Sequence, residues 1–186
     1  MNEPDVSYHG VVYTETGLPP FILRARVVPL RNMGAALAPM NAYQVMQGLE
    51  TLPLRMDRIC ENTLAVAKHL EQHSKVDWVR YAGMESNPHH GLLKKYMGGR
   101  GSGILSFGVK GGMAACTSFI DKLELVTRLV NIGDAKSLAC HPASTTHRQL
   151  SAEELASSGV TEDTVRLSIG IEHIDDIIAD IDQALS

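Results

Sequence analysis

The 186-residue sequence has little cysteine, no excess of positive charge and no long hydrophobic run. Its three cysteines, Cys60, Cys116 and Cys140, are odd in number and form no C-x-x-C pair, which is typical of reduced thiols in a cytoplasm. The net charge of −4 argues against nucleic acid as a partner. No apolar run reaches the roughly 18 residues that a membrane helix needs, and no signal peptide opens the chain. These absences predict a cytoplasmic protein that binds neither membranes nor nucleic acid.

The residues that could suggest a metal or phosphate site lack the context that such sites need. His69 and His73 have a spacing that can seat a metal, but neither an H-E-x-x-H motif nor a third ligand accompanies them. The glycines of 98–103 precede a strand, whereas a phosphate loop follows a strand and opens a helix. Gly111 and Gly112 lack the rest of a glycine-rich motif. We therefore expect no metal and no glycine-rich phosphate loop.

The hydrophobic periodicity predicts helices first and then a mixture of strands and helices. From residue 75 onward the predicted order is β-α-β-α-β-(β)-α-β-α with short connections. Because the strands alternate, we predict an α/β fold of the α+β two-layer type, with helices on one face of a small, mostly antiparallel sheet. The predicted helices are 21–33 (interrupted at Pro29), 40–49, 53–73, 89–97, 113–126, a short one between Ser151 and Gly159, and 174–185. The predicted strands are 76–81, 104–109, 129–132, 165–171 and a short extended stretch at 137–140.

The first 20 residues show no helical period and contain three prolines. A folded protein seldom begins with a long irregular stretch unless another segment packs on it. This pattern suggests that the chain is a piece of something longer.

One predicted strand, 165–171, carries an arginine between apolar residues. Val165, Leu167 and Ile169 share one face, so Arg166 lies on the other. A guanidinium is costly to bury without a partner, and it therefore needs solvent or an anion. A bidentately bound carboxylate ligand is one interpretation. A structural ion pair with Asp or Glu is the other, and the pattern alone favours it.

The polar residues of 134–147 identify no reaction by themselves. The pair Ser144 and His147 lacks the G-x-S-x-G elbow of a nucleophilic serine. The separations of His141, His147 and Asp134 match no named metal site. The residues alone therefore support only an anion site around Arg166.

Four stretches of the sequence together resemble the pyridoxal-phosphate enzymes of cysteine and methionine metabolism, the transsulfuration family. Two short variants, RNMGAALAP and NIGDAKSL, look most like the O-acetylhomoserine sulfhydrylase branch of that family. The resemblance implies the C-terminal domain of a fold-type I transferase: 1–52 would be the tail of the large cofactor-binding domain, and 53–186 the substrate-binding domain with its linking helix. The four stretches are SYHGVVY (7–13), FILRARVVPLRNMGAALAPMNAYQVMQGLETLPLRMDRICEN (21–62), NIGDAKSLACHPASTTH (131–147) and VRLSIGIEHIDDIIADIDQAL (165–185).

The resemblance also implies a set of site residues. The arginine of the family's R-L-S-x-G-x-E motif binds the substrate α-carboxylate, and Arg166 occupies its position, which reverses the preference for a structural ion pair. Asn131 stands where many relatives have serine near the substrate, and Thr146 where the family places a threonine. Arg31 and Asn32 match a segment that relatives bring to the site entrance from a neighbouring subunit. The two histidines of HPASTTH are expected to fix their loop by hydrogen bonds.

The family's catalytic lysine has no counterpart here. It lies in an S-x-T-K-Y setting, and none of the seven lysines of this chain does. We therefore expect pyridoxal phosphate to be held mainly by an absent N-terminal part, and the isolated chain to show no transferase activity and no absorbance of a lysine-bound cofactor.

The implied reaction replaces the acetate of O-acetylhomoserine by sulfide or a thiol, a step of methionine biosynthesis, in a homo-oligomer that is a tetramer of full-length chains. An apolar face left uncovered by the absent part should favour self-association. A fragment of a cystathionine γ-synthase or methionine γ-lyase relative, and a non-catalytic module that binds a carboxylate or a partner, stay open as alternatives.

Overall fold

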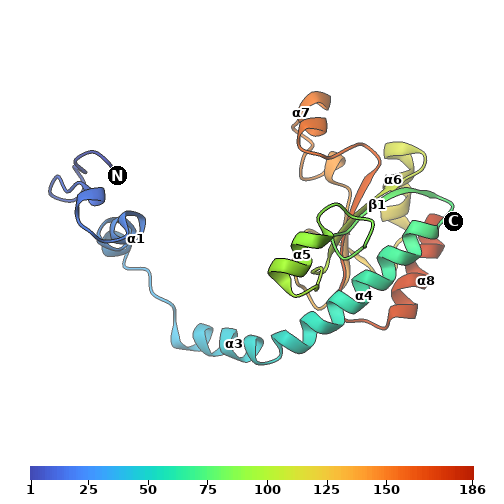
Figure 1. The fold of residues 1–186 in the computed structure, drawn as a ribbon, viewed down its shortest axis with the longest axis horizontal. Coiled ribbons are helices and arrows are strands. Elements are labelled where there is room, and N and C mark those ends of the chain that lie inside the picture. The colour runs from blue at the N-terminus through green and yellow to red at the C-terminus, as the bar shows by residue number, and fades with distance from the viewer. The chain divides into compact units, whose positions relative to one another are not determined.

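The computed structural model describes residues 1–186, apart from the side chain of Ala152, and divides them into two compact units, Met1–Leu49 and Glu50–Ser186. The helical elements are η1 (Tyr13–Glu15), α1 (Pro20–Ala25), η2 (Arg26–Leu30), α2 (Arg31–Met33), α3 (Pro39–Glu50), α4 (Leu52–Gln72), α5 (His90–Met97), α6 (Gly112–Lys122), η3 (Pro142–Ser144), α7 (Ala152–Ser157) and α8 (Ile174–Leu185) (Figure 1). The strands are β1 (Val76–Arg80), β2 (Ile104–Val109), β3 (Thr127–Arg128), β4 (Leu138–Cys140) and β5 (Thr164–Ser168).

The unit Met1–Leu49 contains a continuous helical stretch that changes its winding. α1, η2 and α2 follow one another without a break, and η2 is a π-helical turn that contains Pro29. Proline has no N–H to donate and its ring clashes with the preceding turn, so a widened turn is a common accommodation. Pro29, where a kink or an end of the helix is predicted, instead lies in a turn of wider winding, and the helical stretch continues to Met33. Among the described side chains of this unit only Tyr13 is buried.

The unit Glu50–Ser186 is built on a five-stranded sheet with the order β1-β2-β5-β4-β3. The pairs β1–β2, β2–β5 and β4–β5 are antiparallel, and the edge pair β3–β4 is parallel. The mostly antiparallel sheet of the sequence prediction is thus confirmed. In the middle of the sheet, Arg166 of β5 lies between Ser106 of β2 and Cys140 of β4.

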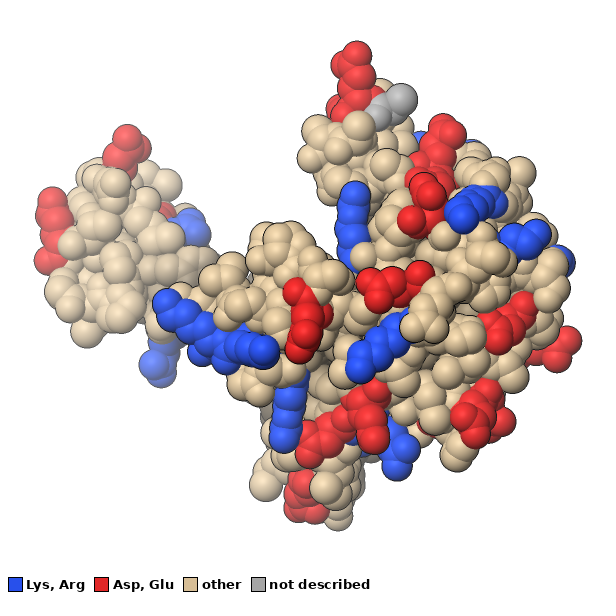
Figure 2. Space-filling view, turned by 45° about the vertical axis from the view of Figure 1, so that its right-hand side comes forward, with Lys and Arg blue, Asp and Glu red and all other residues tan. Residues whose placement is uncertain are grey.

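Three helices, α4, α6 and α8, cover one face of this sheet, as predicted. α4 contacts β1 and β2, α6 contacts β2 and β5, and α8 packs against both helices (Figure 1). The strands contribute alternate residues to the core because successive side chains point to opposite faces. Phe107 of β2 is fully buried and meets Phe119 of α6 edge to face, with ring centroids 5.6 Å apart. Figure 2 shows acidic and basic side chains interspersed over one face of the molecule.

The helix predicted at 113–126 ends four residues early, at Lys122. The carboxylate of Asp180 on α8 accepts the N–H groups of Glu124, Leu125 and Val126 at 2.8–3.0 Å, so these groups have no need of helix carbonyls. The side-chain amide of Gln183 donates to the carbonyl of Lys122, which is one of the carbonyls that the helix end leaves open. A contact with a residue more than 50 positions away therefore ends the helix.

Two strand predictions also need correction. The third strand is Thr127–Arg128 and not 129–132, because the freed chain after α6 pairs at once with β4. The strand predicted at 165–171 ends at Ser168, and Ile171 beyond it is 40% exposed. Beyond β5, the N–H of Ile171 donates to the carbonyl of Ala135 at 3.0 Å, so this segment packs on a loop and leaves the sheet.

His69 and His73 connect two helices. His69 Nε2 lies 2.6 Å from a carboxylate oxygen of Asp182 on α8, and His73 Nε2 lies 3.8 Å from the same oxygen. Within the described residues, no group of three or more His, Cys, Asp or Glu side chains is arranged to hold a metal ion. In the same part of the chain, none of the helices combines the length and the apolarity needed to cross a bilayer.

Candidate functional site

Arg166 lies on the sheet face opposite the three-helix layer. Its neighbours along β5, Val165 and Leu167, are fully buried in the core, whereas Arg166 is half-buried. Its guanidinium Nη2 donates to the backbone carbonyl of Asn131 at 3.3 Å. Because successive side chains of β5 point to opposite faces, Arg166 places a cation at the middle of the sheet, on the face that the three helices do not cover.

The guanidinium has no carboxylate partner among the described residues. The ion pairs of the structure involve other cations, and the structural ion pair that the pattern alone favoured for Arg166 is not found. A planar fork with five N–H donors and only one long bond to a carbonyl retains most of its donors for a ligand. Carboxylates match this fork bidentately.

The loop 131–137 brings Asn131 to Arg166. Asn131 is exposed, and its side-chain oxygen accepts the N–H of Ile132 at 2.9 Å. Its contact with Arg166 is made by the backbone carbonyl. The structure therefore joins two of the predicted site residues, while the substrate role of each stays a prediction.

A polar network that sequence reasoning missed holds this loop. Glu172 accepts the backbone N–H of Ser137 at 2.6 Å and its hydroxyl at 2.9 Å, and the Ser137 hydroxyl accepts the N–H of Gly170 at 2.9 Å. The side-chain amide of Asn62 on α4 donates to the carbonyls of Gly170 and Glu172. No local signal marks this contact, because Glu172 lies beyond the end of β5 and 35 residues from Ser137. We call Asn62, Ser137, Gly170 and Glu172 the Glu172 network.

The loop after β4 is fixed by His141. This side chain is 2% exposed, and its Nε2 lies 2.8 Å from the carbonyl of Glu162. Because a carbonyl can only accept, Nε2 carries the proton, and Nδ1 accepts from the Ser144 hydroxyl at 2.8 Å in the neutral ring. The expected structural role of His141 is confirmed.

Thr146 is not joined to Arg166 by any contact of the described residues. Its exposed hydroxyl lies 2.8 Å from Nδ1 of His147, so the two residues bond to each other at the surface. The predicted substrate contact of Thr146 stays a prediction.

Arg31 and Asn32 belong to the unit Met1–Leu49. The guanidinium carbon of Arg31 lies 5.7 Å from the centre of the Tyr8 ring, a cation–π arrangement, and Asn32 is exposed. Their part at a site entrance is a property of an assembly and stays a prediction.

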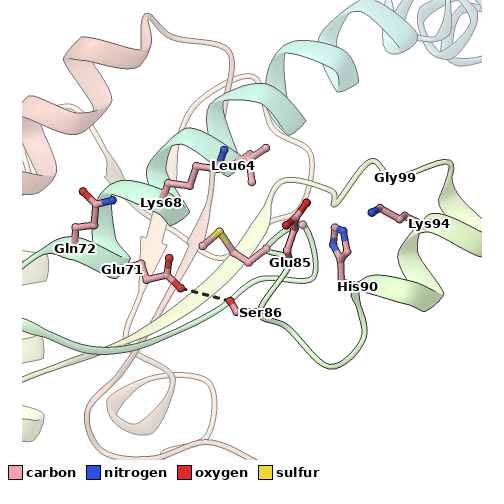
Figure 3. Close-up of a pocket in the computed structure, with 11 residues that line it drawn as sticks. Leu64, Lys68, Glu71, Gln72, Glu85, Ser86, His90, Lys94 and Gly99 are labelled. Carbon is pink, nitrogen blue, oxygen red and sulfur yellow. Dashed lines mark hydrogen bonds between the residues drawn. The ribbon is translucent and has the colours of Figure 1, made fainter.

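A pocket of about 690 Å³ lies elsewhere on the larger unit, between α4, the loop 83–86 and α5 (Figure 3). Lys68, Glu71 and Lys94 line it, and the Ser86 hydroxyl donates to Glu71 at 3.4 Å. One nitrogen of His90 lies 2.9 Å from the carbonyl of Ala82. The charged side chains that line the pocket are exposed and of both signs, which is typical of a solvated surface. The pocket shares no residue with the Arg166 site.

The lysines do not fit the cofactor that the resemblance implies. A Schiff-base lysine needs a desolvated or otherwise activated amine beside the substrate. All seven lysines are exposed on the surface of the described chain. Lys136 belongs to the 131–137 loop, where its backbone N–H donates to Asp134, and among the described residues no lysine side chain bonds to Arg166. Arg166 and the loop 131–137 can orient a carboxylate, but without a suitable lysine they do not make a pyridoxal-phosphate site.

Comparison with known proteins assigns the family. Residues 7–186 match the model of the Cys/Met metabolism PLP-dependent enzymes. The O-acetyl-L-homoserine sulfhydrylase of Leptospira meyeri is 50% identical over 195 residues, which cover 100% of this chain and 44% of that protein. The homocysteine synthase of Schizosaccharomyces pombe is 49% identical, with 100% of this chain and 43% of that protein covered.

A solved structure shows the same fold. It is a putative O-acetylhomoserine (thiol)-lyase from Campylobacter jejuni with a pyridoxyl-lysine monophosphate, and it is similar with a TM-score of 0.86 and 46% identity over 99% of this chain and 44% of that one. The chain spans less than half of the length of these relatives. It belongs to the family of pyridoxal-phosphate-dependent enzymes of cysteine and methionine metabolism.

Proposed function

We propose that the chain is the C-terminal part of an O-acetylhomoserine sulfhydrylase, in which Arg166 binds the α-carboxylate of the amino-acid substrate. The observation that carries the proposal is the half-buried Arg166 guanidinium, which has no carboxylate partner among the described residues and lies on the open sheet face. The names of the relatives support the substrate class. The resemblance of the blocks around Arg166 and His141 to blocks that follow the cofactor lysine in the family supports a position after that lysine in the longer chain.

The proposed enzyme is a cytoplasmic transferase and homo-oligomer that exchanges acetate on the γ-carbon of O-acetylhomoserine for sulfide or a thiol. Sulfide gives homocysteine, and methanethiol gives methionine. Pyridoxal phosphate, bound mainly by the rest of the enzyme, supplies the electronic stabilisation of the reaction. The residues of this chain fix the orientation of the substrate through its carboxylate. Since its lysines are exposed, the chain alone is expected to be inactive.

The decisive experiment combines the chain with the cofactor-bearing remainder of the Leptospira meyeri relative and measures homocysteine and acetate. We expect activity only from the combination. Arg166→Ala should raise KM for O-acetylhomoserine by about ten- to hundredfold, the effect of losing a charged hydrogen-bonded pair. Arg166→Lys should recover part of the loss because it keeps the charge but not the fork.

Arg58→Ala, at an exposed position of α4, is the matched control and should leave KM unchanged. An unaltered KM in Arg166→Ala would overturn the carboxylate role. Activity with cysteine as the nucleophile would instead favour a cystathionine γ-synthase, and methionine cleavage a methionine γ-lyase. A folded combination without any activity would favour a non-catalytic binding module.

A further inference from the structure

Glu172 lies next to the proposed carboxylate site without facing it. We infer that Glu172 is a positioning residue, whose carboxylate holds the 131–137 loop on the end of β5 and so keeps the Asn131 carbonyl at the Arg166 guanidinium. The effect of Glu172 on substrate binding rests on the proposed function, in which Arg166 binds the carboxylate. The positioning itself can be measured without any substrate.

Both carboxylate oxygens of Glu172 are engaged by one residue of the loop. Oε1 accepts the Ser137 N–H at 2.6 Å, and Oε2 accepts the Ser137 hydroxyl at 2.9 Å. Ser137 is fully buried, so neither of its donors can turn to water instead. An acceptor-only, bidentate group is what two converging donors require.

The far side of Glu172 is held equally firmly. Asn62 Nδ2 donates to the backbone carbonyls of Gly170 at 3.1 Å and of Glu172 at 3.0 Å, and Asn62 is 1% exposed on α4. Any side chain at Gly170 would overlap the Ala135 carbonyl, so the loop and the strand end are in direct backbone contact. The Glu172 network therefore fixes the loop to the core helix.

The loop has few other bonds that could hold Asn131 in place. Residues 131, 132, 135 and 136 are exposed, and the hydrogen bonds of Asn131 and Asp134 side chains run to the next residues of the same loop. The N–H of Ile171 also donates to the carbonyl of Ala135, but this bond joins the same two segments, the loop and the chain after β5, that Glu172 holds together. Loss of Glu172 should release the loop and leave the guanidinium of Arg166 without its carbonyl partner.

The test uses the uniformly ¹⁵N-labelled 186-residue chain and compares Glu172→Gln with Glu61→Gln. Glu61 is exposed on α4, so its variant makes the same chemical change outside the network. Without ligand, Glu172→Gln should speed the hydrogen exchange of the Ile171 and Gly170 amides on the order of tenfold, as expected when one charged hydrogen bond is lost. It should also increase the mobility of the Arg166 Nε–H, while amides of β2 keep their protection.

A second arm titrates O-acetylhomoserine and follows the Arg166 Nε–H signal. The dissociation constant should rise on the order of tenfold in Glu172→Gln, the effect of losing about one charged hydrogen bond in the support of the Arg166 guanidinium. Ser137→Ala keeps the bond from its N–H to Oε1 but removes the hydroxyl that accepts the Gly170 N–H. It should therefore give a smaller change than Glu172→Gln at the Ile171 amide and in the dissociation constant, while the Gly170 amide exchanges faster in both variants. This variant also keeps the inference testable should Glu172→Gln fail to fold.

Three results separate the possibilities. Exchange rates and Arg166 mobility equal to those of Glu61→Gln would overturn the inference. A uniform loss of protection throughout Glu50–Ser186 would also overturn it, because Glu172 would then serve only general stability. A released loop in Glu172→Gln, together with no Arg166 response to O-acetylhomoserine in the unchanged chain, would support the positioning role and reject the carboxylate role of Arg166.

Discussion

The two units of this chain are both helical in part, yet they differ in what they bury. In Glu50–Ser186, the sheet and the helices α4, α6 and α8 enclose a continuous apolar core. In Met1–Leu49, Phe21 is 72% exposed and Met33 78% exposed, and no residue of α3 is buried. Helices of this length are marginal in water without packing. A regular helix pattern therefore does not imply a self-sufficient fold.

The largest expected effect comes from separating the two units. Residues 50–186 should keep cooperative unfolding and dispersed NMR spectra, because their core stays whole. Residues 1–49 alone should be largely unfolded, since their buried apolar area is too small to offset the entropy of ordering the chain. Circular dichroism of both pieces would measure this. A stably helical 1–49 peptide would remove the contrast between the units.

The next largest effect is the difference in stability lost when one phenylalanine of each unit is replaced by alanine. Phe107→Ala removes a fully buried ring from the core and should cost about 3–5 kcal/mol in the free energy of unfolding. Phe21→Ala removes a ring that is largely exposed and should stay within about 0.5 kcal/mol. Urea titration of the full chain measures both. Equal losses would show that Phe21 is covered in solution.

A smaller effect tests the polar contact that ends α6. Burial alone would raise the pKa of the Asp180 carboxyl, but the donors of Val126 and Glu124 outweigh it and hold the pKa below its ordinary value. Asp180→Asn should cost about 1–3 kcal/mol near neutral pH, as for a buried group that loses its hydrogen bonds. Because the folded-state pKa is the lower one, this contribution is present above the unfolded value of about 3.9 and is lost as the pH falls through the folded value.

Unfolding of both proteins as a function of pH provides the measurement. The stability difference between the unchanged chain and Asp180→Asn should shrink in strongly acidic solution. A difference that stays constant down to that range would mean that the charge of Asp180 contributes nothing.

The sequence predicted the parts of the fold that local periodicity determines. α4, α8 and β2 lie where the apolar patterns placed them, because each pattern covers several turns or a whole strand. The end of α6 and the two-residue strand β3 could not be predicted, since Asp180 lies more than 50 residues from the N–H groups that it accepts. Such contacts leave no periodic signal.

The candidate site was predictable to a similar extent. The alternation of β5 placed Arg166 opposite the core, and the family resemblance drew attention to Asn131. Neither indicated that Glu172 would bond to Ser137, because 35 residues separate the two and a carboxylate after a strand is more often at the surface. The sequence does not show that the loop 131–137 packs on the end of β5, and this packing is what brings Glu172 to Ser137.

The burial of the cysteines has a practical consequence for labelling this protein. Burial raises the pKa of the Cys116 thiol to about 11, and its sulfur donates to the carbonyl of Asp163. Cys140 is also buried, whereas Cys60 on α4 is only half-buried. Alkylating reagents attack the accessible thiolate. The native chain should therefore take up one fluorophore or spin label, at Cys60, before the other two thiols react.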